Sequence, residues 1–145
     1  MTAGHNLISK EKQRTKNIQI ETGDGRPIEV HDKYVRICKS YEDSPYEHNY
    51  EDDWGVILLP KDEKSPPLGF GFSLIFATNE TPWSQSEMAF TIGGYPNSNN
   101  LRISSGKGRI ICGRMLEYSI ATEAGLSGAP VFLAYRGVEF VVGLQ

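Results

Sequence analysis

Short runs of β-branched and aromatic residues recur along this chain, and turn-forming residues separate them. The runs occupy residues 17–20, 28–38, 54–59, 70–77, 88–93, 109–112 and 131–145. Runs of this length and composition are typical of β-strands, and helical periodicity is nearly absent. We therefore predict an all-β fold.

Turn signals divide the chain further. Residues 129–134 and 138–144 flank Tyr135-Arg136-Gly137, which predicts a hairpin that turns at Gly137. Gly106-Lys107-Gly108 is also predicted to be a turn, because it lacks the spacing and the following helix of a phosphate-binding loop. The polar stretch 61–67 contains Pro66 and Pro67 and predicts a linker. We place the boundary there, between an N-terminal domain of residues 1–66 and a C-terminal domain of residues 67–145.

Composition excludes several classes of protein. The chain has 145 residues, 39% of them hydrophobic, and a net charge of -3, which fits one domain or two small ones. No apolar run approaches the roughly 20 residues that span a bilayer, so we expect no membrane partner. The start of the sequence has no secretory-signal pattern. The mildly acidic balance argues against a nucleic-acid partner. A short basic run contains Lys10, Lys12, Arg14 and Lys16, and no aromatic residues lie between them. We predict that this run is a solvated loop, because a surface that stacks bases would need such aromatic residues.

The two cysteines, Cys38 and Cys112, show no metal-binding spacing. We therefore predict no metal site. The pair could form one disulfide in an oxidising compartment or remain as thiols, and the sequence leaves both possibilities open.

One serine stands in a glycine-rich segment. Acyl transfer by a serine needs a base, a carboxylate that orients the base, and backbone N–H donors for the oxyanion. The segment Gly-Leu-Ser-Gly-Ala-Pro, from Gly125 to Pro130, could expose the hydroxyl of Ser127 and direct the N–H groups of Gly125 and Ser127 toward one point. Taken alone, such a segment is more often an ordinary turn.

Two earlier segments give this serine its context. Thr-Ala-Gly-His ends at His5, and Asp-Trp-Gly-Val-Ile-Leu-Leu begins at Asp53. Together with Gly-Leu-Ser-Gly-Ala-Pro-Val-Phe, they resemble the three signature segments of chymotrypsin-like serine proteases, close to the glutamyl-endopeptidase branch. The segment that ends Gly93-Gly94-Tyr95-Pro96 and residues 140–145 resemble that branch as well, so the resemblance covers nearly the whole chain.

The resemblance implies a fold and a reaction. It implies two antiparallel β-barrels, the first incomplete at its N-terminus and the second incomplete at its C-terminus. It implies a serine endopeptidase in which His5 is the base, Asp53 orients it and Ser127 is the nucleophile of an acyl-enzyme mechanism. Gly125 and Ser127 would form the oxyanion hole. The implied protein is a secreted monomer that acts on polypeptides without a cofactor.

Three further assignments depend on alignment with this family. Asp52 competes with Asp53, and we choose Asp53 because the acid of the family stands directly before an aromatic residue, then a small residue and a hydrophobic strand. The resemblance places Thr122 and Gln145 in the substrate-binding pocket, where Gln145 replaces a histidine. His31 and His48 lie in no matching segment, and we interpret them as structural or surface residues.

Two other functions stay open. One is a catalytically silent protease-like module with a binding or residual role, and the other is an esterase with the same triad. The strands that precede His5 in the family are absent from the given sequence. We therefore expect a loosely held His5, and poor folding and feeble activity of these residues expressed alone.

Overall fold

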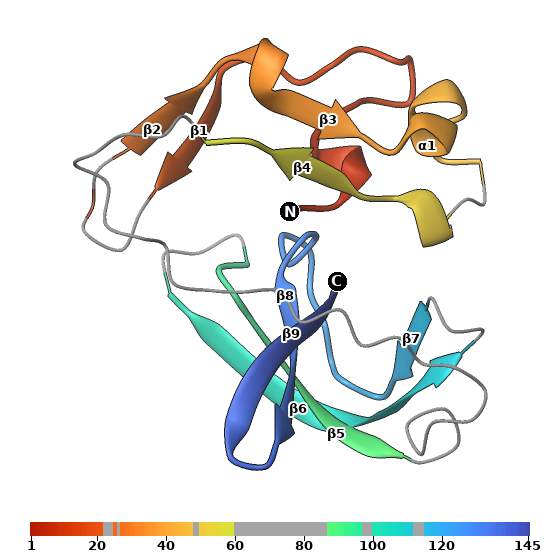
Figure 1. The fold of residues 1–145 in the computed structure, drawn as a ribbon, viewed down its shortest axis with the longest axis vertical. Coiled ribbons are helices and arrows are strands. Elements are labelled where there is room, and N and C mark those ends of the chain that lie inside the picture. The colour runs from red at the N-terminus through yellow and green to blue at the C-terminus, as the bar shows by residue number, and fades with distance from the viewer. Residues whose placement is uncertain (22–24, 26, 48–49, 60–86, 97–99, 112–114) are drawn as a thin grey trace. The chain divides into compact units, whose positions relative to one another are not determined.

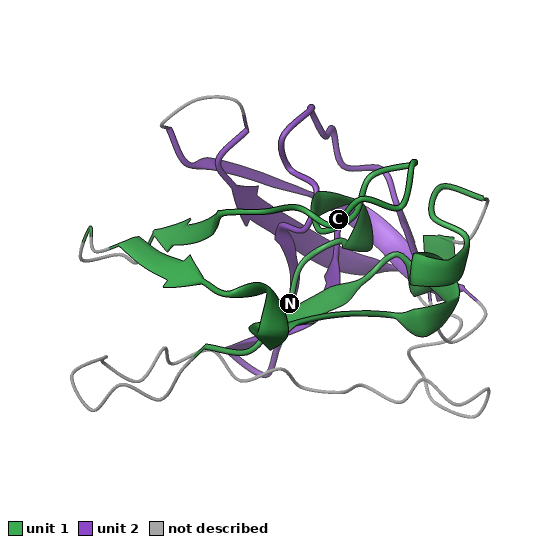
Figure 2. Ribbon diagram, turned by 90° about the horizontal axis from the view of Figure 1, so that it is seen from above, with its two compact units in different colours: residues 1–67 green, residues 68–145 purple. Residues whose placement is uncertain are grey.

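The computed structural model describes residues 1–21, 25, 27–47, 50–59, 87–96, 100–111 and 115–145, and it is mostly β with antiparallel sheets (Figure 1). The predicted predominance of β structure is confirmed. The chain divides into two compact units, Met1–Pro67 and Leu68–Gln145 (Figure 2). Several sequence-based assignments lie outside the described residues: the strand 70–77, the linker 61–67 with the boundary between residues 66 and 67, His48 and Cys112.

Among its described residues, the first unit contains two small antiparallel sheets. Its elements are η1 (Gly4–Asn6), β1 (Ile18–Glu21), β2 (Pro27–Val30), η2 (Asp32–Tyr34), β3 (Val35–Ile37), α1 (Lys39–Asp43), η3 (Tyr50–Asp52) and β4 (Gly55–Ile57). Strand β1 pairs with β2, and β3 pairs with β4. The single-turn helix α1 is too short to give the sequence a helical period.

The run 28–38, which we predicted as one strand, is split between two sheets. The polar segment 31–33 interrupts it and opens the η2 turn. There the His31 side chain accepts a hydrogen bond from the backbone N–H of Lys33 at 3.2 Å. A side chain that bonds to nearby backbone in this way competes with a sheet ladder, which explains the break.

A compact apolar cluster holds the first unit together. Leu7, Val30 and Val35 are buried, and partly buried side chains from both sheets pack against them. Leu7 follows the His5 turn directly, so this core also anchors the segment on which His5 stands.

The predicted basic run is exposed, as expected for a solvated loop. Two of its members contact α1: the Lys12 ammonium donates to the backbone carbonyl of Asp43, and the Arg14 guanidinium pairs with the Glu42 carboxylate. Exposed pairs of this kind contribute little stability, about 0–1 kcal/mol each.

The described part of the second unit forms one five-stranded antiparallel sheet with the order β7-β6-β5-β8-β9 (Figure 1). Its strands are β5 (Met88–Gly94), β6 (Arg102–Ile111), β7 (Met115–Tyr118), β8 (Pro130–Tyr135) and β9 (Val138–Leu144). The register of β5 and β8 sets Phe90 opposite Leu133 and Ile92 opposite Val131. Because side chains alternate across a strand, these four share one face, and together with Ile120 they form the core of the unit.

The predicted hairpin at Gly137 is confirmed. Strands β8 and β9 pair from Tyr135 with Val138, and the two turn residues Arg136 and Gly137 have φ values of 52° and 78°. Two successive positive φ values match the right-handed twist of the flanking strands.

The prediction of a turn at Gly106-Lys107-Gly108 is wrong, because these residues lie inside β6. A Cβ at Gly106 would lie 3.0 Å from the carbonyl oxygen of Ser119, and one at Gly108 would lie 2.6 Å from that of Glu117. The glycines therefore permit close approach of the neighbouring chain rather than a change of direction.

Candidate active site

His5 and Asp53 form a hydrogen-bonded pair in the first unit. Asp53 Oδ2 lies 2.7 Å from His5 Nδ1, and Asp53 Oδ1 accepts the backbone N–H of His5 at 2.8 Å. A carboxylate can only accept, so Nδ1 must carry the ring proton in this pair. In a neutral imidazole, Nε2 is then left as the basic nitrogen. The side chains of His5 and Asp53 are 29% and 18% exposed, which leaves the imidazole accessible while the carboxylate is mostly covered.

The segment that precedes His5 is anchored, in contrast to the loose attachment expected from the sequence. Thr2 forms an antiparallel bridge with Gly55, in which each backbone N–H donates to the carbonyl of the other at 3.0 and 2.9 Å. Ala3 is 3% exposed. The chain then turns through η1, so His5 stands on a short 3-10 turn held by a strand-like pairing on one side.

Gly4 leaves space that Asp53 and Tyr41 fill. A Cβ at Gly4 would lie 2.9 Å from Asp53 Oδ1 and 2.9 Å from Cδ1 of Tyr41. Real Cβ atoms essentially never approach other atoms so closely. Glycine at this position of the Thr-Ala-Gly-His segment therefore leaves room for the Asp53 carboxylate to reach the backbone N–H of His5.

Asp52 has a different partner. Its Oδ2 accepts a hydrogen bond from the Ser40 hydroxyl at 2.5 Å. The structure therefore brings Asp53, and not Asp52, to the ring nitrogen of His5, which agrees with the choice made from the sequence.

Tyr41 lies buried beside this pair, at 2% exposure. Burial, with a contribution from the negative charge of Asp53, raises the pKa of the Tyr41 phenol to about 12. The phenol therefore stays neutral over the whole physiological range. Sequence reasoning did not single out Tyr41, and its only signal was an aromatic residue in an otherwise polar segment.

Ser127 lies in the second unit, on an exposed loop between β7 and β8. Gly125 and Gly128 on either side of it have φ values of 94° and 84°. L-residues with side chains rarely adopt this left-handed region, so the two glycines permit the sharp bends around the serine. Leu126 is 5% exposed and fixes the loop to the unit beneath it.

Backbone hydrogen bonds connect this loop to the end of the chain. The N–H of Gly128 donates to the carbonyl of Gln145 at 2.7 Å, and the N–H of Gln145 donates to the carbonyl of Ala129 at 2.9 Å. The N–H of Ala129 closes the turn by donating to the carbonyl of Leu126 at 2.8 Å. The loop of Ser127 is therefore held by Gln145, the residue that follows β9.

The two predicted substrate-binding residues differ in setting. Thr122 is exposed ahead of the serine loop. The side-chain oxygen Oε1 of Gln145 accepts a hydrogen bond from the hydroxyl of Tyr118, whose pKa is raised by burial. This contact leaves the amide NH₂ of Gln145 as the group that can donate to another molecule. Tyr118 lies in none of the runs predicted as strands, and sequence reasoning did not single it out.

The candidate residues therefore gather within two separate structural settings. His5 and Asp53 come together in the first unit, and the loop of Gly125 and Ser127 is joined to Gln145 in the second. Cys38 is a free thiol beside the Ser40 hydroxyl, at 3.4 Å. Among the described residues there is no cluster of three or more His, Cys, Asp or Glu side chains suited to a metal ion.

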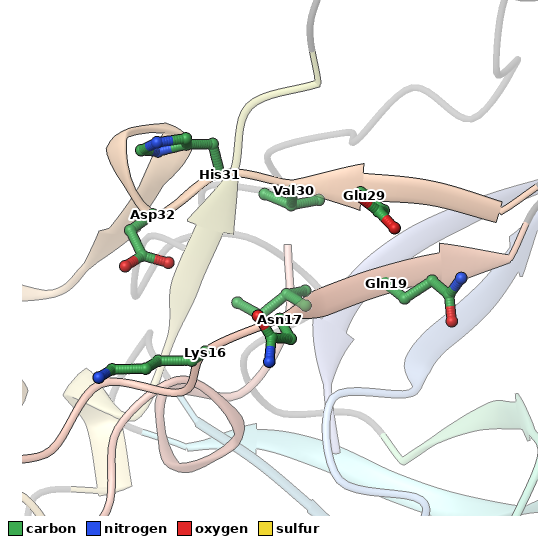
Figure 3. Close-up of a pocket in the computed structure, with 8 residues that line it drawn as sticks. Lys16, Asn17, Gln19, Glu29, Val30, His31 and Asp32 are labelled. Carbon is green, nitrogen blue, oxygen red and sulfur yellow. The ribbon is translucent and has the colours of Figure 1, made fainter.

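A hollow of about 600 Å³ lies along the β1–β2 hairpin (Figure 3). None of the candidate catalytic residues lines it; the lining is Lys16, Asn17, Ile18, Gln19, Glu29, Val30, His31 and Asp32. Gln19 and Glu29 lie opposite each other on the two strands. The rim mixes one cation with two carboxylates, all exposed, so it has no marked preference for one sign of charge.

Within the described ranges, no helix is long and apolar enough to cross a membrane. No protein-family model, curated protein or solved structure gives a significant match to this chain. Arguments about function therefore depend on the site itself.

Proposed function

We propose that this protein is a serine endopeptidase of the chymotrypsin-like type, with His5, Asp53 and Ser127 as its catalytic triad. The observation that carries the proposal is the hydrogen-bonded pair of His5 and Asp53. Its two bonds fix both the tautomer and the orientation of the imidazole, which is the function of a triad carboxylate. The antiparallel sheets of the two units are compatible with two β-barrels, and we assign that architecture as part of the same proposal.

The proposed reaction begins with attack of the Ser127 hydroxyl on the scissile carbonyl. His5 Nε2 takes the hydroxyl proton as the bond between Ser127 Oγ and the carbonyl carbon forms, and Asp53 stabilises the imidazolium. The oxyanion accepts hydrogen bonds from the N–H groups of Gly125 and Ser127. His5 then gives the proton to the amine as the C–N bond breaks and the amine leaves. Water next attacks the acyl carbon while His5 Nε2 takes its proton. The bond to Ser127 Oγ breaks, His5 returns the proton to that oxygen, and the acid product leaves without any cofactor.

The substrate is a polypeptide, and the residue before the scissile bond contacts Thr122 and Gln145. Because Tyr118 occupies Oε1 of Gln145, the amide NH₂ favours a side chain that accepts hydrogen bonds. A neutral amide compensates a buried carboxylate less well than a cation does, so the preference for Glu is weaker than in relatives that have a histidine there. Ala121 provides no acid for Arg or Lys.

A fluorophosphonate probe tests the proposal on the full chain. We expect covalent labelling of Ser127, found by mass spectrometry of the digested protein, and loss of labelling in Ser127→Ala. In His5→Ala the labelling rate should fall by several orders of magnitude, since the base that activates the serine is lost. Ser105→Ala, which removes another exposed serine of the second unit, is the matched control and should label normally.

Either of two results would reject the proposed activity. One is a folded chain that the probe does not label, which would favour the catalytically silent module. The other is labelling that is equal in the parent chain and in His5→Ala, because the serine would then react without its base.

A further inference from the structure

Tyr46 combines two properties that are unfavourable for an aromatic residue. Its side chain is 49% exposed, and its backbone has a φ of 66°. A bulky residue in the left-handed region is a conformational outlier, and such strain persists only where the surroundings impose it. A half-exposed ring gains only part of the free energy that full burial would provide. Contacts that Tyr46 makes with particular groups must therefore account for its position.

Those contacts lead to His5. The Tyr46 ring centroid lies 6.3 Å from that of the His5 imidazole, with the planes tilted by 51°. It lies 6.2 Å from the buried ring of Tyr41, at 48°. Both distances are within the range of aromatic pairs. The Tyr46 hydroxyl also donates to the backbone carbonyl of His5 at 3.4 Å, a long contact that contributes less than the rings.

His5 is thus held by two residues acting on different groups. Asp53 accepts from its ring Nδ1 and from its backbone N–H. Tyr46 contacts its ring and its backbone carbonyl. Hydrogen bonds to Asp53 alone would still allow the imidazole to tilt about the axis through Nδ1, and the ring of Tyr46 restricts that tilt.

We propose that Tyr46 is a positioning residue that fixes the plane of the His5 imidazole. The proposal rests on the proposed function, because the plane of the ring matters for rate only if Nε2 acts as a base. A base must be held within about 0.5 Å of its productive position, so a small gain in ring freedom slows proton transfer. The strained backbone of Tyr46 is retained because the contact with His5 requires that conformation.

Four variants of the full chain test this role. Tyr46→Ala removes the ring, Tyr46→Phe removes only the hydroxyl, and Tyr46→Gly removes the ring while relieving the strained φ. Tyr95→Ala removes a tyrosine that is 65% exposed in the second unit and serves as the control. Two quantities are measured for each: solvent exchange of the His5 Nδ1 proton by NMR, and the rate at which the fluorophosphonate labels Ser127.

We expect Tyr46→Ala and Tyr46→Gly to speed exchange of the Nδ1 proton by about tenfold, because exchange requires the local contact to open. The labelling rate should fall by a similar factor. Tyr46→Phe should change both quantities less, and Tyr95→Ala should change neither. Tyr46→Gly relieves the strained φ that Tyr46→Ala keeps, so its melting temperature should not lie below that of Tyr46→Ala. A merely structural role predicts a lower melting temperature with unaltered exchange in the folded protein.

The two proposals fail in different ways. Unaltered Nδ1 exchange in both Tyr46→Ala and Tyr46→Gly would overturn the positioning role even if Ser127 is labelled. Absence of labelling in the parent chain would reject the peptidase, while the exchange rates would still decide whether Tyr46 holds His5. If Tyr46→Ala fails to fold, Tyr46→Phe and Tyr46→Gly decide the question by the same two measurements.

Discussion

Replacing Asp53 by Asn should reverse the tautomer of His5. The carboxylate now accepts two hydrogen bonds, from the backbone N–H of His5 at 2.8 Å and from its Nδ1 at 2.7 Å. An amide has one accepting oxygen and one donating NH₂. The backbone N–H of His5 can only donate, so the side-chain oxygen of the new amide must remain its acceptor. The NH₂ then faces Nδ1, which must become the acceptor, and the ring proton moves to Nε2.

The effect on rate should be much larger than the effect on stability. With the proton on Nε2, the nitrogen that should accept from Ser127 is blocked, and losses on the order of 10⁴ in turnover are typical of such a change. Two charge-assisted hydrogen bonds become neutral ones, each weaker by about 1 kcal/mol. Because both side chains are partly exposed, solvent screening reduces the loss, and we expect the free energy of unfolding to fall by about 1–2 kcal/mol.

The ¹⁵N chemical shifts of the two imidazole nitrogens report the tautomer directly, and labelling of Ser127 reports the rate. Asp52→Asn is the matched control, because Asp52 accepts from the Ser40 hydroxyl and not from His5. It should leave the tautomer unchanged and the labelling rate within a few-fold of the parent. The reasoning is refuted if Asp53→Asn keeps its proton on Nδ1, or if Asp52→Asn is the more damaging substitution.

Three further substitutions test the surroundings of the pair and one distant turn. Gly4→Ala should lower the free energy of unfolding by about 1–3 kcal/mol and displace Asp53, because its Cβ would lie 2.9 Å from both Asp53 and Tyr41; urea unfolding measures this. Gly137→Ala should cost about 1–2 kcal/mol by the same assay, through its φ of 78° alone, since no atom lies within 4 Å of the new Cβ. Tyr41→Phe should flatten the decline of stability at alkaline pH. The folded pKa of about 12 exceeds the ordinary value near 10, so the stabilisation by the neutral phenol is present below about pH 10 and is lost as pH rises through about 12. An equally steep alkaline decline in the variant would contradict this assignment.

The sequence predicted the strands in which buried and exposed side chains alternate regularly. It did not predict the structure where pairing with neighbouring strands, rather than local preference, determines it. Strand β5 alternates buried and less buried side chains, and Gly137 suits the positive φ of 78° at its place in the turn. Strand β6 was predicted only at its end, because Ser104, Ser105 and Lys107 provide no apolar pattern. It forms because β5 and β7 pair with it on both sides. Pairing with neighbours can override weak local preference.

The candidate site was likewise predicted only in part. The resemblance of three segments to protease signatures predicted His5, Asp53 and the serine loop, because the proposed chemistry uses particular side chains there. Tyr41, Tyr46 and Tyr118 were not identified, because an aromatic residue that touches a site looks the same in sequence as one that fills a core. Their roles follow only from contacts between segments that are distant along the chain.

The choice between Asp52 and Asp53 shows how one backbone pairing determines the chemistry. The bridge between Thr2 and Gly55 is a single antiparallel pair. It stands two residues before Gly4 and two residues after Asp53, so it holds these two segments near each other. A side chain at position 4 would occupy the space of that carboxylate, so glycine is required, and the 3-10 turn of η1 then brings the next residue, His5, onto the same carboxylate. A shift of one residue in the bridge would bring Asp52 toward this space instead of Asp53. The pairing of His5 with Asp53 thus depends on two backbone hydrogen bonds between Thr2 and Gly55, which involve neither of the two side chains.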